Sequence, residues 1–506
     1  MTRVLPAFVV IPLATAFVLP VFGKKGKNAA TVLANLATIT LLILAIVCIG
    51  KSGFYEVGNW SIRVGIIMVL DGLSSLMLLA INLVSAAAML FSARYMEQYT
   101  AKSKYLSLFM LMVAAMNGLV LAGDLFNLFV FLEIASLASY ALVGFGCEHE
   151  ELEASFKYMV LGSVASSFIL FAIALVYGNT AYLNMACISK AIQSSGLNAG
   201  LTFALALFIV GFGLKAALVP FHAWLPDAHP SAPAPISAML SGVIIKTLGV
   251  YALTRVVFNI FGVSVSVGWL LVTLGLLSMI AGAFLALGQW DFKRLLAYSS
   301  ISQVGYVVLG IGLGATLIAK KANPAWASLA LLGGLFHLVN HAVYKSLLFL
   351  TSGSVEMSTG TRQLKEMGGL AQVMPVTRTT CTIASASIAG IPPFSGFWSK
   401  LILVIAAVQA GLYWIAAILV FVSLCTLIMY LKVQRYAFLG ELPENLQQIK
   451  ENKGAMLVAM VVLALLCVLM GLLVIVPSLR DSILNPAVSV LTAGPKHWEI
   501  AGILKM

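Results

Sequence analysis

About fourteen stretches of this chain are apolar over roughly 20 residues each, the length that an α-helix needs to cross the hydrocarbon core of a membrane. Backbone N–H and C=O groups must be paired inside a membrane, so such stretches fold as helices. They begin near residues 4, 29, 65, 105, 124, 155, 200, 233, 266, 294, 325, 375, 400 and 455. The pattern predicts an all-α polytopic membrane protein with about 14 transmembrane helices.

The composition favours the same class of protein. Hydrophobic residues occupy 61% of the 506 positions, only 9% are charged, and the mean hydropathy is +1.03. A soluble domain carries about 25% charged residues. The net charge of +12 is spread over short loops, so it indicates membrane topology and contact with anionic lipid headgroups, not nucleic-acid binding.

The distribution of basic residues predicts the orientation in the membrane. The first apolar stretch, Val4 to Phe22, precedes Lys24, Lys25 and Lys27, which reverses the order found in a signal peptide, so we expect a mature helix. Outside the apolar stretches, sixteen basic residues fall on the side that holds these three lysines, and ten, including Arg255, fall on the other. Because cytoplasmic loops are the more basic ones, both chain ends are predicted to lie outside.

Prolines interrupt two of the predicted helices. The interruptions lie within Lys215–Pro235 and within Ala389–Lys400. Proline removes a backbone donor, so such segments are tolerated inside a membrane only where protein or a wet cavity satisfies the freed carbonyls. Interrupted helices in matching halves are typical of inverted-repeat transporters, whose ion sites lie near the membrane midplane. The alternative is two re-entrant loops with a purely structural role.

The positions of the interruptions also suggest a domain organisation. They fall in the seventh and twelfth predicted helices, which suits two inverted five-helix repeats made of helices 4 to 8 and 9 to 13. We expect an N-terminal three-helix segment over residues 1–104, a first repeat over 105–262, a second over 263–440, and a C-terminal helix and tail over 441–506. The chain has no GxxxxGK[ST] or GxGxxG motif and no long polar segment, so we expect neither a catalytic redox site nor a cofactor.

Charged residues inside the apolar stretches are the strongest functional signal. They are Glu133, Lys215, Lys246, Lys345 and Lys400. Each charge costs roughly 2.5 to 3.5 kcal/mol at the centre of a membrane helix, so the set indicates a route for ions. A nearby carboxylate stabilises the charged form of a buried lysine, and movement of Glu133 would therefore switch whether Lys215 holds its proton. A static buried ion pair of these two residues is the alternative.

Several strings in the chain resemble one known family. They are Gly123–Glu133, Lys215–Pro235, Asp291–Gln303, His337–Leu348 and Pro392–Phe397. Together they are similar to the antiporter-like membrane subunits of respiratory complex I, of Mrp-type sodium/proton antiporters and of membrane-bound hydrogenases. The match runs in order from about Asp71 to Lys400, and its first string is most similar to the Mrp D-type members.

The resemblance implies roles for individual residues. Glu133 and Lys215 would form the charged pair of a first half-channel, and Lys246 would be a connecting lysine. His337, His341 and Lys345, spaced by four, would share one helix face and relay protons. Lys400 would end the second half-channel. Some complex I members carry glutamate there, and this chain lacks the long lateral helix of the largest members, so it resembles a D-type or middle subunit.

The resemblance also implies partners and a location. These are other membrane subunits, including homologous antiporter-like ones, lipid, and either a peripheral iron–sulfur redox arm or none, all in the plasma membrane of a prokaryote. The expected function is proton translocation, or sodium/proton antiport, by a multi-pass subunit. A stand-alone solute carrier and a non-conducting scaffold subunit of a redox complex are the alternatives.

Other polar residues receive plainer interpretations. Asp71 and Asp124 are expected at helix ends, as interfacial or capping residues, and the group Asp291, Lys293 and Arg294 as an ion cluster in a cytoplasmic loop. His222, Asp227 and His229 lie in the first interrupted segment, where they either line a channel entrance or are solvated. The acidic run Cys147–Glu153 is interpreted as a loop without metal, and the six cysteines as reduced and buried.

Overall fold

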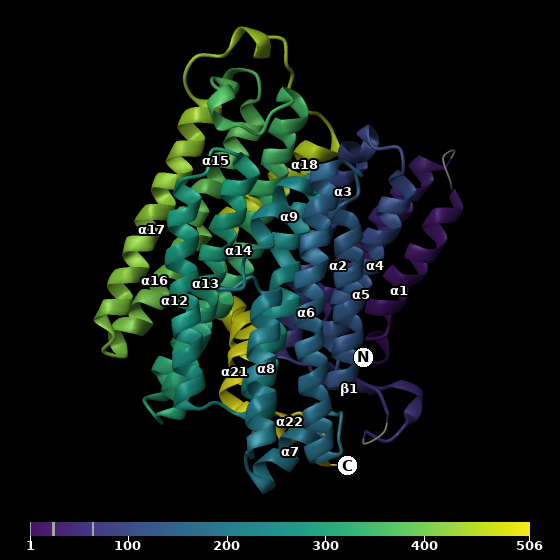
Figure 1. Ribbon diagram of the computed structural model, residues 1–506, viewed down its shortest axis with the longest axis vertical. Helices are drawn as coiled ribbons and strands as arrows, with labels where there is room; N and C mark the ends of the chain where they lie inside the picture. Colours follow the sequence, from purple (N-terminus) through teal and green to yellow (C-terminus); the bar gives the residue numbers. More distant parts are fainter. Residues whose placement is uncertain (1, 23–25, 63–64, 506) are drawn as a thin grey trace.

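The long helices of the computed structural model run roughly along one axis of the molecule (Figure 1). The structure describes residues 2–22, 26–62 and 65–505, so Lys24, Lys25 and Arg63 of the charge pattern lie outside the described residues. Within them, twelve helices are long and apolar enough to cross a membrane, and two shorter apolar helices belong to two further crossings. The prediction of an all-α polytopic membrane protein is confirmed.

Eleven of the crossings contain one main helix each. They are α1 (Ala7–Val18), α2 (Lys27–Val47), α3 (Gly72–Tyr95), α4 (Lys102–Leu121), α5 (Leu125–Val143), α6 (His149–Thr180), α12 (Val265–Leu287), α13 (Phe292–Ala319), α14 (Pro324–Thr359), α17 (Tyr413–Val433) and α18 (Ala455–Leu469). The eighth crossing is composite. It comprises α10 (Ala234–Met239), the π-helical segment η5 (Leu240–Tyr251), α11 (Ala252–Arg255) and the π-helical segment η6 (Val256–Phe261).

The two predicted interruptions are present. In the seventh crossing, α8 (Ala199–Lys215) and α9 (Leu225–Ser231) are separated by residues 216–224. In the twelfth, α15 (Pro375–Ala389) and α16 (Ser395–Gln409) are separated by residues 390–394. Two other prolines, Pro324 and Pro375, occupy the first position of α14 and of α15, where the missing N–H would have had no helical partner. The division into two five-helix repeats stays a prediction.

Two predicted helix starts were wrong. The third helix begins at Gly72, not near residue 65, because β1 (Gly53–Glu56) pairs with β2 (Ile67–Leu70) in a short antiparallel hairpin. The thirteenth helix begins at Tyr413, not near residue 400, because the stretch around residue 400 is the second half of the interrupted twelfth helix. In both places the apolar residues continue across the end of a helix or strand, so composition alone does not locate the start of the next helix.

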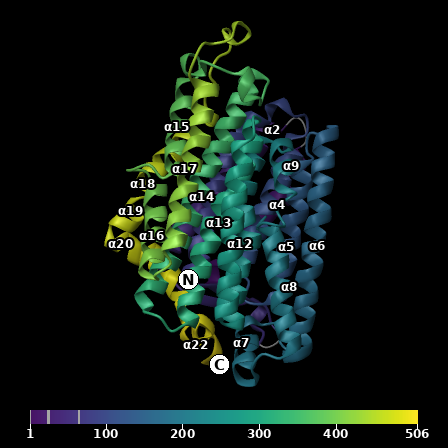
Figure 2. The same ribbon diagram turned by 60° about the vertical axis from the view of Figure 1, so that its left-hand side comes forward.

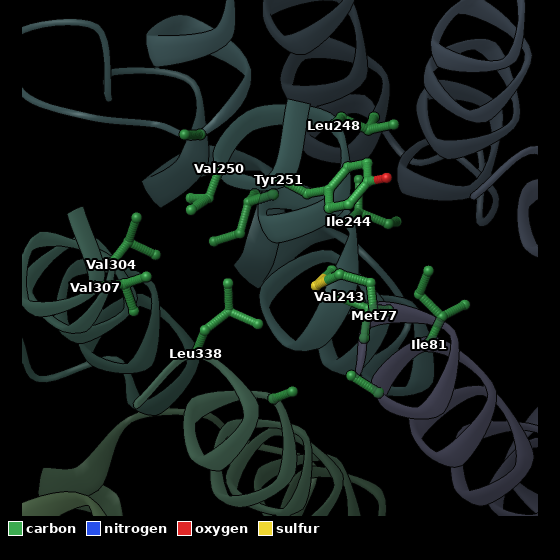
Figure 3. Close-up of a cluster of buried hydrophobic side chains, with 14 of the residues drawn as sticks. Met77, Ile81, Val243, Ile244, Leu248, Val250, Tyr251, Val304, Val307 and Leu338 are labelled. Carbon is green, nitrogen blue, oxygen red and sulfur yellow. The ribbon is translucent and has the colours of Figure 1, made fainter. Parts of the chain in front are cut away.

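The eighth, tenth and eleventh crossings form the centre of the bundle. Their most apolar windows are 100%, 94% and 83% buried, whereas the windows of the first, second and sixth crossings are only 33% to 39% buried. Figure 2 shows α12, α13 and α14 between α5, α6 and α8 on one side and α15 to α18 on the other. Side chains of α3, the eighth crossing, α13 and α14 interdigitate in the core, including Met77, Val243, Val304 and Leu338 (Figure 3).

The C-terminal segment closes the lower end of the bundle in Figure 1, where both chain ends lie. After α18 it forms α21 (Asn485–Ala493) and α22 (His497–Ile500). Here α21 packs on the start of α3 so closely that a Cβ at Gly72 would lie 2.2 Å from the backbone carbon of Pro486. The tail is thus an integral part of the helix bundle, although it follows the last crossing.

Candidate ion path

Glu133 and Lys215 meet in the first half of the chain. Glu133 lies in the middle of α5, and Lys215 is the last residue of α8, where the seventh crossing is interrupted. The Nζ of Lys215 is 4.0 Å from the Oε1 of Glu133. The lysine side chain is only 2% exposed, whereas the glutamate is 31% exposed. The expected charged pair is therefore brought together at the helix break.

Hydroxyl groups hold each member of this pair. Lys215 Nζ donates to Ser136 Oγ at 2.9 Å and to Tyr140 OH at 3.3 Å. Ser166 Oγ on α6 donates to the Oε1 of Glu133. None of these three hydroxyls was among the residues predicted from the sequence. Two of them could have been predicted, because Ser136 and Tyr140 follow Glu133 by three and seven residues and so share its helix face.

Side chains satisfy the polar groups that the first interruption frees. Trp224 Nε1 donates to the carbonyl oxygen of Leu214 at 3.0 Å. The N–H of Val219 donates to Ser278 Oγ of α12 at 2.9 Å. These bonds keep an irregular backbone stable inside the protein, as the membrane environment requires.

Lys246 occupies the π-helical segment η5 at the centre of the bundle and is 1% exposed. Its Nζ donates to the carbonyl oxygen of Ser241, and none of the ion pairs among the described residues involves it. π-Helical turns inside α-helices often mark functional sites, because they shift side chains out of the regular register. The η5 segment packs against α14, the helix that carries Lys345.

His337, His341 and Lys345 lie on α14, and all three are fully buried. His337 makes two contacts outside its helix, from Nδ1 to Ser399 Oγ at 2.9 Å and from Nε2 to Gln303 Oε1 at 3.2 Å. In the described part of the chain, neither ring nitrogen of His341 has a hydrogen-bond partner. The row thus connects α13, α14 and α16.

Lys345 is bound by hydroxyls, as Lys215 is. It donates to Ser299 Oγ on α13 and, at 3.3 Å, to Tyr430 OH on α17. Ser299 and Gln303 are four residues apart and face α14 together. Both belong to the string Asp291–Gln303 that resembles the family, but neither was among the predicted path residues.

Lys400 lies at the second interruption, six residues into α16, and is 6% exposed. Its Nζ donates to the carbonyl oxygens of Ile388 and Ala389 at 2.8 and 3.4 Å and to Ser423 Oγ at 3.1 Å. It also lies 5.0 Å from the ring centre of Tyr306. Like Lys215, it lies beside a broken helix, and it satisfies freed carbonyls there.

The three suggested entrance residues do not lie together. Asp227 is at the surface, where it pairs with Lys157 at 3.2 Å and with Arg294 at 3.5 Å. His229 is fully buried, and its ring stacks on Phe349 with the ring centres 4.5 Å apart. His222 lies in the irregular segment between α8 and α9 and is partly exposed. Solvation therefore fits Asp227 and not His229.

Asp291, Lys293 and Arg294 were predicted to form an ion cluster in a loop, but they lie at the start of α13, and each forms an ion pair with a residue of another segment. Asp291 caps α13 and forms an ion pair with Arg362, with the charged atoms 3.3 Å apart. Lys293 pairs with Glu356 of α14 at 2.7 Å. The residues begin a helix, and their charges join α9, α13 and the end of α14 into one ionic surface.

Helix capping by Asp71 and Asp124 is confirmed. Asp124 caps α5, and burial raises the pKa of its carboxyl group. Asp71 caps α3 and also accepts two bonds from Arg255, at 2.7 and 3.0 Å. Assigning Arg255 to a loop was wrong, because it is 2% exposed within the eighth crossing. His497 of the tail joins the pair, with Nε2 at 2.8 Å from Asp71 Oδ2.

Two smaller expectations need correction. The acidic run was expected to form a loop, but residues from His149 onward begin α6 with Glu148 as the cap. Five cysteines are buried as expected, whereas Cys147 is exposed. Among the described residues, no three His, Cys, Asp or Glu side chains are placed to hold a metal ion.

Models of two protein families match the chain. The model described as "NADH:quinone oxidoreductase/Mrp antiporter, TM" matches residues 122–426. The model described as "NADH-Ubiquinone oxidoreductase (complex I), chain 5 N-terminus" matches residues 54–106. The first match includes all seven residues of the expected path, from Glu133 to Lys400.

Individual relatives cover almost the whole chain. The D-type subunit of the Na(+)/H(+) antiporter of Alkalihalophilus pseudofirmus is 33% identical over 472 residues, which are 92% of this chain and 93% of the relative. The N-type subunit of the NADH-quinone oxidoreductase of Desulforudis audaxviator is 34% identical over 446 residues, 87% of this chain and 86% of the relative. The chain is thus about equally similar to an antiporter protein and to a respiratory one.

Solved structures show the same similarity in three dimensions. A chain of the Mrp complex from Dietzia sp. superposes with a TM-score of 0.88 at 29% identity, covering 99% of this chain and 100% of that one. A chain of an archaeal membrane-bound sulfane sulfur reductase gives a TM-score of 0.87 at 31% identity, covering 99% of both chains.

Proposed function

The chain belongs to the NADH:quinone oxidoreductase/Mrp antiporter family of membrane subunits, and from this premise we propose that it translocates protons as one subunit of a multisubunit membrane complex. The complex is either a redox-driven proton pump or an antiporter that exchanges sodium for protons. Protons pass through two half-channels, one at each interrupted helix, which are joined by the buried polar residues at the centre of the bundle.

The way in which the buried lysines are bound is the observation that carries this proposal. Lys215, Lys345 and Lys400 each donate to hydroxyl or carbonyl oxygens, which are uncharged acceptors. Neutral acceptors also tolerate the uncharged amine, which accepts a bond from a hydroxyl. Such a site can therefore hold or release a proton without leaving a buried polar group unpaired.

The buried pair of Arg255 and Asp71 differs in its hydrogen bonding from the pair of Glu133 and Lys215. Arg255 and Asp71 are bound by two short hydrogen bonds and are both buried, as expected for a permanent ion pair. Glu133 and Lys215 are 4.0 Å apart, and each is bonded to its own hydroxyls. A small movement of α5 relative to α8 would change their interaction, which favours a switch over the static pair.

Transport through the row requires that neighbouring groups not all be charged together. Neighbouring buried lysines repel each other when both carry a proton, so a proton on one favours release from the next. The proposed order is Glu133 and Lys215, then Lys246, then Lys345, His341 and His337 along α14, and finally Lys400. Asp227, in the ion pairs at the surface, is proposed to form the entrance to the first half-channel.

Proton uptake into inverted membrane vesicles, followed with a pH-sensitive dye, tests the proposal. Lys215→Ala and Glu133→Ala should each abolish transport while the subunit still enters the membrane. Lys453→Ala, at an exposed lysine, is the matched control and should leave the rate unchanged. Normal transport by both inner variants would contradict the proposal and favour the non-conducting scaffold.

Two further measurements separate the remaining alternatives. Uptake of organic solutes by cells that express this chain alone would favour a solute carrier. Identification of the subunits that co-purify in a mild detergent distinguishes the two kinds of complex. Iron–sulfur proteins among them would indicate a redox pump, and their absence an antiporter.

A further inference from the structure

A pocket of about 270 Å³ opens beside Lys400. It lies between the end of α15, one face of α16 and one face of α17, and apart from Lys400 and Ser423 its lining is apolar. Gly390 forms part of its wall with a φ of +83°, a left-handed conformation that favours glycine, and a Cβ there would approach the Lys400 Cδ to 3.1 Å. The pocket therefore exists because the twelfth helix is interrupted here.

The mouth of the pocket opens on the apolar outer surface of the helix bundle. Val420 and Leu424 of α17 line it and are 49% and 55% exposed. They continue a row of exposed apolar side chains along α17, which lies with α16 at the outer edge of the bundle (Figure 1). The pocket lies near the middle of the crossing, because the interruption divides it into two helices of 15 residues each. A molecule dissolved in the membrane interior can enter it sideways.

The inner end of the pocket holds a lysine amine without a counter-charge. Lys400 donates to three neutral oxygens and forms no ion pair among the described residues. A protonated Lys400 would be a buried charge without an opposite partner, which is costly, so the site favours a ligand that supplies an anion together with the proton. The bond to the Ala389 carbonyl, at 3.4 Å, is the longest of the three and the easiest to exchange for a new acceptor.

We propose that this pocket binds a single-chain carboxylic acid from the membrane, with the carboxylate on the Lys400 ammonium and the alkyl chain between α16 and α17. The acid enters in its neutral form, which dissolves in hydrocarbon. Its O–H bond then breaks and an N–H bond forms on the neutral Lys400 amine, so the acid becomes a carboxylate and the amine an ammonium. No net charge enters the membrane in this step.

The chemistry of the pocket discriminates between classes of membrane ligand. A phospholipid holds its headgroup at the membrane surface and cannot bring a phosphate to mid-depth. A long-chain alcohol fills the apolar walls but supplies no anion. Bound acid would keep Lys400 charged and so block the last step of the path, a consequence that rests on the proposed function.

Photolabelling tests binding without measuring transport, because free fatty acids themselves carry protons across membranes. The probe is palmitic acid with a diazirine on its chain, added to the complex in nanodiscs of neutral phospholipid, and adducts are mapped by mass spectrometry. We expect adducts on the pocket residues of α16 and α17, competition by oleic acid, and none by oleyl alcohol. Lys400→Ala should weaken labelling at least about tenfold, as the loss of a charge-assisted bond predicts.

A matched pair of variants guards against misfolding of the lysine variant. Leu424→Trp places a large ring in the pocket mouth and should lose the adducts, whereas Phe421→Trp, exposed on the same helix outside the pocket, should retain them. Uniform labelling along the length of α17, or equal competition by oleyl alcohol, would overturn the proposal. So would labelling of the free subunit but not of the complex, since an adjoining subunit would then cover the pocket. Transport by Lys215→Ala would refute the proposed path and leave this result unaffected.

Discussion

The Nδ1 of His337 lies 2.9 Å from the Oγ of Ser399, the residue immediately before Lys400. The histidine belongs to the uninterrupted helix α14 and the serine to the second half of the interrupted crossing. This contact joins the central row of histidines and lysine to the second helix break. A proton that reaches His337 therefore has a hydroxyl in hydrogen-bond contact on the side toward Lys400.

Ser399→Ala should slow transport without stopping it. The hydroxyl is one hydrogen-bonded step in the path, and a single neutral bond contributes about 1 kcal/mol, which corresponds to a rate loss of roughly fivefold. The initial rate of proton uptake in inverted vesicles measures the effect. Ser167→Ala, at an exposed serine of α6, is the control. A rate equal to that of the unmodified protein would show that protons bypass Ser399.

Ser166→Ala tests whether hydroxyls keep Glu133 and Lys215 apart. Without the bond from Ser166, the Glu133 carboxylate is free to pair directly with Lys215 and to stabilise its charged form. We expect slower proton release and a reduction in transport of several-fold, again on the scale of one hydrogen bond. The rate should depend less on Ser166 than on Lys215, and a loss as complete as that of Lys215→Ala would contradict this ranking.

Asp71→Asn should destabilise the whole subunit. It removes the carboxylate that pairs with Arg255 and leaves a buried guanidinium without a counter-charge, a change that costs about 3 to 5 kcal/mol. His497 loses its partner at the same time, so the tail should detach from α3. The melting temperature in detergent measures the stability, and protease sensitivity of the C-terminal segment reports the detachment. Asp481→Asn, at an exposed carboxylate of the tail, is the control.

The same carboxylate predicts a dependence of stability on pH. Burial opposes ionisation of Asp71, but Arg255 and His497 hold its pKa well below its usual range. A depressed carboxyl pKa stabilises the folded state above the unfolded value, about 3.9, and this stabilisation is lost as the pH falls further. The melting temperature should therefore differ most between the unmodified protein and Asp71→Asn near neutral pH, and the difference should shrink below about pH 4. A constant difference would show that Asp71 is not the titrating group.

Thiol labelling can decide the predicted orientation. Cys147 is exposed next to the start of α6, whereas the other five cysteines are buried. A maleimide that cannot cross membranes should label Cys147 in inverted vesicles and not in intact cells, because this loop lies on the side predicted to be cytoplasmic. Cys147→Ser should abolish the labelling. Labelling from the outside of intact cells would reverse the orientation.

The residues that carry chemistry were largely visible in the sequence. Glu133, Lys215, Lys246, Lys345 and Lys400 stand out because charge is rare in apolar stretches, and the prolines mark both interruptions. These signals are local, since the cost of a charge in a membrane and the effect of proline on a helix depend on a few neighbouring residues.

The partners of these residues were much harder to predict. Ser299, Tyr430 and Ser399 are ordinary residues in their own helices, and only the packing of α13, α14, α16 and α17 brings them to Lys345 and His337. Arg255 was misplaced for the same reason, because its partner Asp71 lies 184 residues away.

The sequence by itself determined that this chain crosses a membrane many times, where its helices are interrupted, and which charges lie inside. Hydrophobicity and proline act within single helices, so these features need no knowledge of the fold. Only the tertiary structure decided that Glu133 and Lys215 are separated by their own hydroxyls, that the tail binds Asp71, and that Lys400 borders a pocket open to the membrane. Such features arise from contacts between segments far apart in the chain, and the distances that govern them exist only after the helices pack.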